Sequence, residues 1–385
     1  GGVPENFRNW FVIRSDKAIE SYETVDNMAV IKFRTVRGEK VHLQLASSFI
    51  SADQAMINLG EVAGRTFDDV RDAARDRWNE VLGRIEVSGG SEDQLRTFYS
   101  CLFRSTLFPH KFYEISAGGE KIHYSPYNGE ICKGTLYTDS GFWDVFRAQL
   151  PLLNLVYPSV NAEIQEGLMH IAEENPFLPE WASPGHRDCM VGNNSASIVA
   201  DAYIKGIYTE GADKLYEALV YGAEHAHPQI SSSGRLGYEY YNSLGYIPYN
   251  VGINENVART LEYAYDDWCI LQMAGKLGRR GVSAECTDLA RKMASDWMEI
   301  NDEGDHYRKT FKYRGSWSLK YNLVWDRVLG FNLFPREVAE RELAAYRKVA
   351  MPFGLPLDSR KEWTKTDWEL WCSTFTGKRA DFDCV

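Results

Sequence analysis

The sequence predicts a mainly α-helical protein. We expect a complete or incomplete α/α toroid, preceded by strands of a β-sandwich. Three observations support this fold class. Apolar residues follow a helical period in most segments after residue 62, whereas before it they alternate with polar residues. Successive helical segments are not separated by strands, so the βαβ alternation of a parallel sheet is missing. Long loops rich in Pro, Gly and Tyr connect the helices, and such loops build the site at one end of a toroid.

Composition narrows the class of partner. The chain has 385 residues, enough for one large domain or two ordinary ones. Its net charge of −11 argues against a nucleic-acid surface, which requires a basic stripe. No uninterrupted apolar run is long enough to span a bilayer, and the opening GGVPENFRNW has neither the charged nor the apolar region of a signal peptide. The 11 Trp and 22 Tyr suit sugar binding, although composition alone favours a large helical core as their explanation.

Residues 1–62 are expected to be the end of a β-sandwich domain. The segments YETVDNMAVIKFRTV (22–36) and EKVHLQLASSFI (39–50) alternate apolar with polar residues and are rich in β-branched types. The RGEK sequence at 37–40 predicts a hairpin turn between them. Two strands cannot bury a core alone, so we expect this region to belong to a larger sheet or to lie as an edge on the helices.

Residues 63–385 are expected to form the helical domain. Ser91 and Gln94 show the capping-box pattern of a helix start, and Asn194 is a predicted N-cap. Helices are predicted over residues 66–85, 91–108, 142–156, 161–173, 195–207, 212–226, 255–277, 283–299, 319–328 and 335–348.

The cysteines and short motifs exclude several enzyme classes. None of the seven cysteines forms a CxxC pair, so zinc-ribbon and thioredoxin motifs are excluded. The sequence also contains no GxSxG, P-loop, HExxH or EF-hand string. Several cysteines lie in apolar helical contexts that are typical of small core residues.

Seven strings between about Phe33 and Gly278 resemble glycoside hydrolase family 92, in order and in register. They are SSFISADQAMINLGEV, WNEVLGRIEV, TFYSCLFRSTLFPH, GFWDVFRAQLPLLNLVYP, LPEWASPGHRDCMVGNNSASIVADAYIKGI, GYIP and ENVARTLEYAYDDWCILQMAGKLG. Members of this family are calcium-dependent, exo-acting α-mannosidases.

This resemblance implies a β-sandwich followed by an (α/α)6 barrel of six helical hairpins. The implied reaction releases a terminal α-linked mannose from a glycan with inversion: one carboxylic acid protonates the leaving oxygen and a second carboxylate activates water. Calcium would hold two sugar hydroxyls, and oxygen ligands suit that hard cation. The family also implies a place outside the cytoplasm, periplasmic or secreted.

The resemblance changes near residues 280–305. From about residue 305 the strings GSWSLKYNLVWDR, GLPLDSR and TKTDWELW resemble glutaminase A-like six-hairpin proteins. Strings like EGNAWQY, GNEPDH and GNDDLGQMSAW, which family 92 is expected to use for its catalytic acid and base, do not occur. Asp358, Asp367 and Glu369 are the carboxylates predicted to replace them.

Two other functions stay open at this point. The region after residue 305 favours a glutaminase-like amidohydrolase, and the missing strings favour a carbohydrate-binding relative without catalysis. Inversion requires two carboxylates that face each other across the pocket at roughly 6.5–9.5 Å. Their separation therefore tests the enzymatic prediction.

Asp144 and Arg147, in the string WDVFR, share a helix face at i, i+3 spacing. One interpretation is a structural ion pair. The other is a sugar subsite, in which Trp143 and Asp144 contact the substrate and Arg147 orients the Asp144 carboxylate. The resemblance favours the second interpretation, because WD-x-x-R is a string of the family.

The loop string PEWASPGHRDCMVGNN predicts a second wall of the pocket, since it is dense in polar and turn-forming residues. Trp181, His186, Asp188 and Cys189 are its candidates for substrate binding. His186 taken alone is more typical of a surface histidine. Cys189 is not expected to be a nucleophile, because no His or Asn partner is marked for it.

The predicted helix 255–277 adds a third set of candidates. Glu262 and Asp266 lie one turn apart, an arrangement that suits a metal ion or acid–base chemistry. Glu262 is predicted to bind substrate. The alternative is a structural ion pair between Arg259 and Glu262 within the helix.

Overall fold

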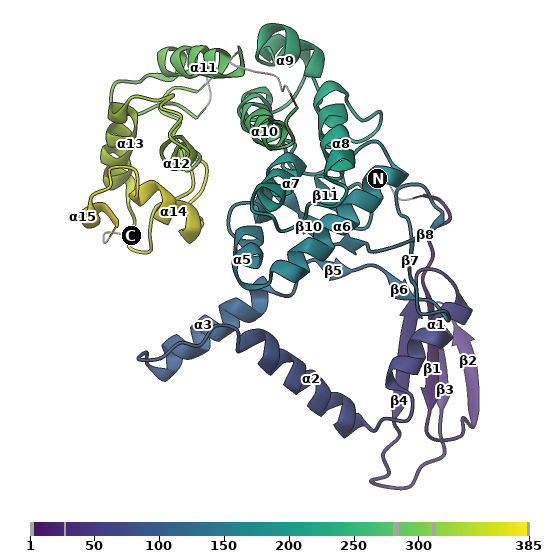
Figure 1. The fold of residues 1–385 in the computed structure, drawn as a ribbon. Helices are drawn as coiled ribbons and strands as arrows, with labels where there is room; N and C mark the ends of the chain where they lie inside the picture. Colours follow the sequence, from purple (N-terminus) through teal and green to yellow (C-terminus); the bar gives the residue numbers. More distant parts are fainter. Residues whose placement is uncertain (1–3, 27, 280–284, 310–312, 383–385) are drawn as a thin grey trace. The chain divides into compact units, whose positions relative to one another are not determined.

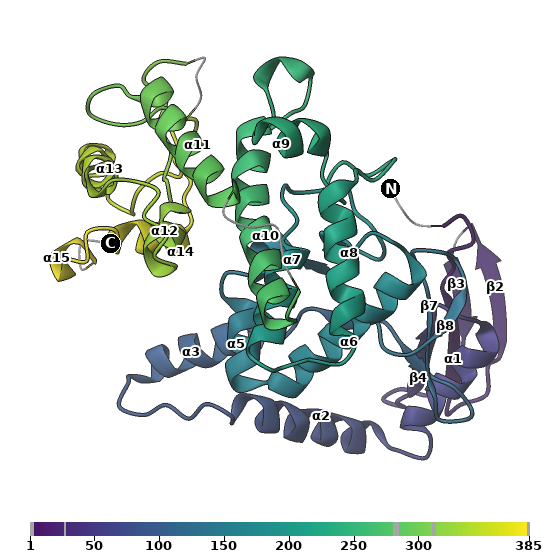
Figure 2. The same cartoon turned by 45° about the horizontal axis from the view of Figure 1, so that its top comes forward.

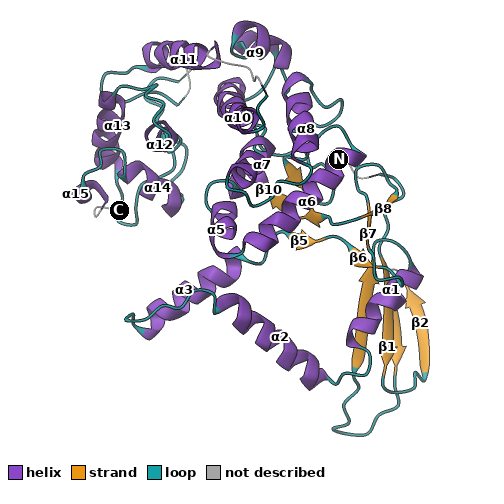
Figure 3. Ribbon diagram, in the orientation of Figure 1, coloured by secondary structure: helices purple, strands orange, loops and turns teal. Residues whose placement is uncertain are grey.

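The structure is a computed structural model, and it describes residues 4–26, 28–279, 285–309 and 313–382. The chain divides into two compact units, Gly1–Gly281 and Val282–Val385. Helices dominate both units, and the longer strands lie at the start of the chain (Figures 1 and 3). The predicted fold class, mainly α with strands ahead of the helices, is confirmed. The predicted domain boundary after residue 62 stays a prediction.

The N-terminal strands form two antiparallel pairs. β1 (Trp10–Ser15) pairs with β4 (Leu43–Ser48), and β2 (Ser21–Val25) pairs with β3 (Met28–Lys32). The hairpin predicted at residues 37–40 is therefore wrong. The turn lies inside the first predicted strand, beside Asp26, whose φ of 53° interrupts the extended backbone.

Three helices follow these strands. α1 (Ala52–Leu59) packs against β1 and β4 and continues into the short 3-10 helix η1 (Gly60–Val62). α2 (Phe67–Leu82) and α3 (Glu92–Ser105) each begin with a capping box. The box at α3 joins Ser91 to Gln94 in both directions, which confirms that prediction.

Short strands hold the loops between α3 and α7. They are β5 (His110–Lys111), β6 (Glu114–Ile115), β7 (Lys121–Tyr124), β8 (Ile131–Lys133), β9 (Tyr137–Thr138), β10 (Ser140–Gly141) and β11 (Trp181–Ala182). β6, β7 and β8 form a three-stranded sheet, while β5 pairs with β9 and β10 pairs with β11. Segments distant in sequence are thereby fixed side by side.

The helix predicted over residues 142–156 is broken in the structure. α4 (Phe142–Val145) ends after about one turn. α5 (Gln149–Val156) begins after Ala148, whose φ of −144° lies outside the helical range. α6 (Pro158–Glu174) follows with proline at its first position, where a missing N–H removes no helical hydrogen bond.

The core of the first unit consists of helices. α7 (Ser195–Ile204), α8 (Ala212–Glu224) and α10 (Asn256–Lys276) pack together, and α6 packs against α7 and α8 (Figures 1 and 2). α9 (Tyr238–Leu244) and the 3-10 helix η2 (Tyr249–Val251) precede α10. α7 is buried on almost every side, because its sequence SASIVADAYI carries small or apolar residues all round.

The second unit contains α11 (Glu285–Asn301), α12 (Leu323–Val328), α13 (Arg336–Val349), α14 (Thr366–Ser373) and α15 (Arg379–Phe382). The first residues of the helix predicted at 283–299 lie outside the described residues. Glu342 of α13 is fully buried and accepts the backbone N–H of Tyr307 at 2.7 Å. Among the described residues, no helix combines the length and apolar character that crossing a membrane requires.

Candidate active site

Strands β10 and β11 bring the two predicted pocket strings side by side. Gly141 lies opposite Trp181 in this antiparallel pair. The indole covers the glycine so closely that a β-carbon at residue 141 would lie 2.2 Å from the Nε1 atom of Trp181. Glycine is therefore required at this contact, and Trp143 follows two residues later.

Glu262 is held by side chains from two other segments. The Nε1–H of Trp143 donates to its Oε1 at 3.1 Å, and the amide of Asn194 donates to its Oε2 at 3.4 Å. Burial raises the pKa of Glu262, while the Arg147 charge and these two hydrogen bonds oppose the rise. Trp143 and Glu262, predicted from distant strings, are thus in direct contact.

The predicted pairing of Asp144 with Arg147 is wrong, both as a structural ion pair and as a contact that orients the Asp144 carboxylate. In the part of the chain that the structure describes, no ion pair joins them: Asp144 is exposed, whereas Arg147 is buried. Arg147 donates from Nε to the carbonyl of Trp143 at 3.0 Å, and its Cζ lies 4.1 Å from the centroid of that ring. The reason is the end of α4 at Val145, because i, i+3 pairing requires a continuous helix. Sugar binding by Asp144 itself stays a prediction.

The alternative ion pair between Arg259 and Glu262 is also wrong. Arg259 donates to the carbonyl oxygens of Asn254 and Ser231 at 3.1 and 3.0 Å. Helical side chains point toward the N-terminus. Arg259 lies in the first turn of α10, so its guanidinium reaches the loops that precede the helix. The Glu262 carboxylate instead accepts the hydrogen bond from Trp143.

Asp266 is fully buried one turn after Glu262. Its Oδ2 accepts the backbone N–H of Asn193 at 2.7 Å. Burial raises the pKa of Asp266 well above its usual range; the Arg235 charge opposes this rise, and nearby Glu262 adds to it. The spacing read from the sequence therefore corresponds to two buried carboxylates beside the turn that starts α7.

Arg235 is a central residue that the sequence analysis missed. Its side chain is 1% exposed, pairs with Asp267 at 2.6 Å and donates to the Asn193 side-chain oxygen at 2.9 Å. It also lies 5.0 Å from the ring centroid of Tyr263. A single arginine in the loop string SSSGRLG carries no local pattern, so it becomes visible only in the fold.

Glu180 is a second missed residue, and it caps α7. Its two carboxylate oxygens accept the N–H of Ser195 at 2.9 Å and the hydroxyl of Ser195 at 2.6 Å. Burial raises the pKa of Glu180 to about 8, and the hydrogen bonds from Ser195 oppose the rise. The predicted cap by the Asn194 side chain is wrong, because that amide bonds Glu262 instead. We call Glu180, Glu262 and Asp266 the carboxylate cluster.

The loop 186–189 is tied to three successive serines. His186 is buried, which corrects its interpretation as a surface residue, and its Nδ1 lies 3.0 Å from the hydroxyl of Ser233. Burial lowers the pKa of His186 to about 3, so the ring is neutral near pH 7. The exposed Asp188 accepts the hydroxyl of Ser231 at 2.8 Å and the N–H of Ser232 at 3.1 Å.

The remaining loop candidates lie close to these contacts. The backbone N–H of Cys189 donates to the hydroxyl of Ser232 at 3.2 Å, and its thiol is free and half-buried. Trp181 is also half-buried, with the Arg187 guanidinium 4.9 Å from its ring centroid. The predicted loop residues thus keep partial access to solvent around a buried His186.

The three carboxylates predicted for catalysis lie in the second unit. Burial would raise the pKa of Asp358, but hydrogen bonds from Arg360 and Lys309 outweigh it and hold the pKa well below its usual range. A general acid needs the opposite shift, so that role does not fit Asp358. Glu369 is buried and accepts the N–H of Leu355. Asp367 is exposed in the first turn of α14.

Comparison with solved structures identifies relatives of known fold. An inverting mannosidase of family 92 from Bacteroides thetaiotaomicron VPI-5482 is 37% identical, with a TM-score of 0.76 over 89% of this chain and 51% of that one. An α-mannosidase of the same family from Bacteroides thetaiotaomicron, in complex with mannoimidazole, is 25% identical, with a TM-score of 0.73 over 91% of this chain and 51% of that one. The chain thus spans about half the length of these structures.

Curated relatives separate the two parts of the sequence. An uncharacterized secreted glycosidase of Arthroderma benhamiae is 29% identical over an alignment of 313 residues that covers 76% of this chain and 36% of that protein. Glutaminase A of Aspergillus oryzae is 33% identical over 88 residues in the C-terminal region, 22% of this chain and 13% of that protein. The predicted glutaminase resemblance of the C-terminal region is confirmed, whereas the family 92 match runs on to residue 348, past the change predicted at residues 280–305.

The family assignment rests on a match to the glycosyl hydrolase family 92 catalytic domain over residues 54–348. This range covers most of the chain and contains Trp143, Glu180 and Glu262. The solved family members have an (α/α)6 toroid-type domain, in agreement with the predicted fold class. The chain belongs to glycosyl hydrolase family 92.

Proposed function

We propose that the protein is a glycoside hydrolase that removes terminal α-linked mannose from glycans. The observation that carries this proposal is the contact between Trp143 and Glu262 beside the β10–β11 pair, inside the region that matches the family. Sugar rings pack their C–H face on an indole and donate hydroxyl hydrogen bonds to exposed carboxylates, such as that of Asp144 next to Trp143. The mannosidases among the similar structures support mannose as the sugar.

Exposure assigns different roles to the site residues. Trp143 and Trp181 are half-buried, and Asp144 and Asp188 are exposed, so these four are proposed to contact the sugar. His186, Cys189 and Arg147 are proposed to hold the pocket walls in place. The carboxylate cluster is proposed to hold Trp143 and the start of α7 in place, because its three members are buried and already accept hydrogen bonds.

Inversion would require an acid and a base on opposite sides of the sugar at roughly 6.5–9.5 Å. Asp358 and Glu369 are bound by cations or by backbone N–H within the second unit. Asp367 is exposed and therefore able to meet water. On the resemblance, Asp367 is proposed as a catalytic carboxylate, and a large loss of kcat in Asp367→Asn with an unchanged melting temperature would support that role.

Calcium is proposed as a cofactor on the family resemblance. The oxygen-rich neighbourhood of the carboxylate cluster has suitable chemistry, because the buried Asn194 Oδ1 and Asp266 Oδ1 accept no hydrogen bond from a described residue. In the described ranges, however, no three acidic side chains bring ligand atoms together there. Calcium takes about 6–8 oxygen ligands, so these residues alone do not complete a calcium site.

We also propose that the protein acts outside the cytoplasm. A relative that aligns with 76% of the chain is named a secreted glycosidase. Glycans with terminal mannose are accessible there. Cell fractionation followed by immunodetection of the native protein tests this location, and recovery in the cytoplasmic fraction alone would contradict it.

An assay on the purified chain separates the proposed functions. Release of nitrophenol from an aryl α-mannoside, with β-mannose as the first anomer seen by NMR, supports an inverting mannosidase. Loss of this activity with a chelator and its return with calcium support the cofactor. Hydrolysis of glutamine would favour the amidohydrolase, which the glutaminase similarity supports. Binding of mannose without turnover would favour a carbohydrate-binding relative.

Asp144→Asn tests the sugar-binding surface within the same assay. The side chain is exposed and not ion-paired to Arg147, so the substitution should leave the melting temperature unchanged. Loss of a charged hydrogen-bond acceptor should raise KM about tenfold or more, equivalent to about 1.4 kcal/mol. An unchanged KM for both Asp144→Asn and Trp143→Ala would show that the sugar binds elsewhere.

A further inference from the structure

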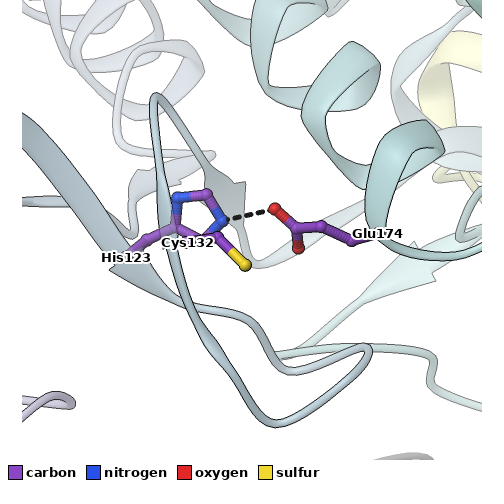
Figure 4. Close-up of side chains that lie close together, drawn as sticks. All are labelled: His123, Cys132 and Glu174. Atoms are coloured by element: carbon purple, nitrogen blue, oxygen red, sulfur yellow. Dashed lines mark hydrogen bonds and ion pairs between the residues drawn. The ribbon is translucent and has the colours of Figure 1, made fainter.

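His123, Cys132 and Glu174 come together between a sheet and the end of a helix (Figure 4). His123 on β7 lies opposite Cys132 on β8 in the antiparallel register, and Glu174 is the last residue of α6. One ligand atom from each residue lies within 4.8 Å of the others. None of the three takes part in the sugar site proposed above.

The hydrogen bonds of His123 leave one unusual contact. Its Nδ1 lies 3.0 Å from the carbonyl oxygen of Gly134, and a carbonyl only accepts, so Nδ1 carries a hydrogen. In the neutral ring, Nε2 then presents a lone pair. That lone pair faces Oε1 of Glu174 at 2.8 Å, and an ionised carboxylate also only accepts. A proton or a cation must therefore lie between these two atoms.

The side chains on either side of this proton or cation are buried, so water does not satisfy their polar atoms. The His123 side chain is fully buried and that of Glu174 is 8% exposed. The second carboxylate oxygen of Glu174 is buried and has no hydrogen-bond partner among the described residues. A buried acceptor without a partner is unfavourable. An ion placed between the three side chains could engage this oxygen as well.

The donor set has the chemistry of a zinc site. Imidazole, thiolate and carboxylate are ligands of Zn²⁺, whereas Ca²⁺ and Mg²⁺ prefer oxygen alone. Metal-bound histidines commonly donate their other ring N–H to a backbone carbonyl, as His123 does to Gly134. Tetrahedral zinc holds ligand atoms about 3.3–3.8 Å apart. The His123–Glu174 contact would have to open by about half an ångström to admit the ion.

We propose that His123 Nε2, Cys132 Sγ and a carboxylate oxygen of Glu174 bind a zinc-class transition metal ion, which ties the β7–β8 hairpin to the end of α6. Three protein ligands leave one tetrahedral position for water. Zinc binds cysteine as the thiolate. Metal binding therefore releases the thiol proton to solvent.

The location connects this metal site to the sugar pocket. The chain leaves α6 at Glu174 and reaches Glu180 and Trp181 within the next seven residues. From the turn between β7 and β8, the Tyr127 ring contacts that of His186 edge to face, with 5.0 Å between centroids. An ion at Glu174 would thus fix two segments that position the pocket loop: the chain from α6 to Trp181, and the β7–β8 turn that carries Tyr127.

Metal analysis of the purified full chain tests the proposal. After treatment with a chelator and dialysis against zinc, the wild-type chain should retain about one equivalent by elemental analysis. Cobalt in place of zinc should give a near-ultraviolet thiolate charge-transfer band that excess calcium does not remove. His123→Ala, Cys132→Ser and Glu174→Gln should weaken binding more than about 100-fold, because loss of an outer-shell partner alone costs about 10-fold to 100-fold. Cys101→Ser, at an exposed free cysteine, should bind as the wild type does.

Two results would overturn the proposal. The first is a wild-type chain without bound zinc and without the cobalt–thiolate band, which would establish a charged His123–Glu174 ion pair instead. The second is equal binding by Cys132→Ser and Cys101→Ser. The wild-type cobalt spectrum decides the question even if a variant fails to fold. Neither readout requires mannosidase activity, so failure of the proposed function leaves this test intact.

Discussion

At the scale of single residues, Gly192 controls how closely the turn before α7 approaches the carboxylate cluster. Its φ is +86°, a left-handed conformation that glycine adopts without strain. A β-carbon at this position would lie 2.9 Å from Cβ of Glu262 and 2.8 Å from the amide nitrogen of Asn194. The hydrogen bond between Asn194 and Glu262 therefore depends on the absence of a side chain at residue 192.

Gly192→Ala should lower the unfolding free energy of the first unit by more than the cost of the left-handed backbone at residue 192. The left-handed conformation costs about 1 kcal/mol for a non-glycine residue, and the overpacking adds about 1–3 kcal/mol. Gly206→Ala is the matched control, because its φ is +72° and nothing lies within 4 Å of the added carbon. Urea unfolding of both variants measures the difference. Equal losses of unfolding free energy would show that the contact with Glu262 is relaxed in solution.

Glu180 should make stability depend on pH in the direction opposite to most carboxylates. Burial raises its folded pKa to about 8, from 4.5 for the model group. Between these values the folded chain binds a proton that the unfolded chain has released, so the unfolding free energy should fall as pH rises from about 4.5 to 8. The slope contributed by Glu180 is at most about 1.4 kcal/mol per pH unit.

Glu180→Gln should flatten this slope, because the amide does not titrate. Urea unfolding at intervals between about pH 5 and 8 measures it, with the exposed Glu86→Gln as the control that should follow the wild type. Parallel curves for Glu180→Gln and the wild type would mean that Glu180 is ionised in the folded state, held by Ser195 and Arg235.

At the scale of elements, the sequence predicted those features that depend on residues close together in the chain. The start of α3 followed from Ser91 and Gln94, since a capping box is formed by residues three apart. The strand pairing did not follow, because β4 pairs with β1, about 30 residues away, and not with the nearer β3. The break at Ala148 also carried no signal, because FWDVFRAQLPLL is apolar at helical spacing throughout.

The pairing of β10 with β11 depends on the missing side chain at Gly141. Gly141→Ala should displace the Trp181 indole, because the added carbon would lie 2.2 Å from its Nε1 atom and the backbone there is not left-handed. We expect a loss of about 1–3 kcal/mol of unfolding free energy and a change in tryptophan fluorescence. The same chemical change at Gly275, within α10 and with open space around it, should stabilise by about 0.5–1 kcal/mol. A stabilising Gly141→Ala would contradict the close packing of Trp181.

At the scale of the whole molecule, the site is assembled from segments that the sequence separates widely. Trp143 and Glu262 were predicted as candidates because each lies in a family string, but their hydrogen bond spans 119 positions. Arg235 and Glu180 were missed because their roles depend on Asn193 and Ser195, which no local period relates to them. Residue types indicate chemistry, whereas the tertiary fold decides which groups are buried together.

The division into two compact units predicts that each can be destabilised on its own. In the second unit, fully buried Glu342 accepts the Tyr307 N–H at 2.7 Å and lies 3.8 Å from Lys320. Glu342→Gln would leave the buried Lys320 without its counter-charge, a loss of about 3–5 kcal/mol. Hydrogen exchange measured by mass spectrometry should then accelerate in α13 and leave α7 protected. Gly192→Ala should have the opposite effect, with α7 exposed to exchange and α13 unchanged. Equal acceleration of both helices by either variant would show that the chain unfolds as one cooperative unit.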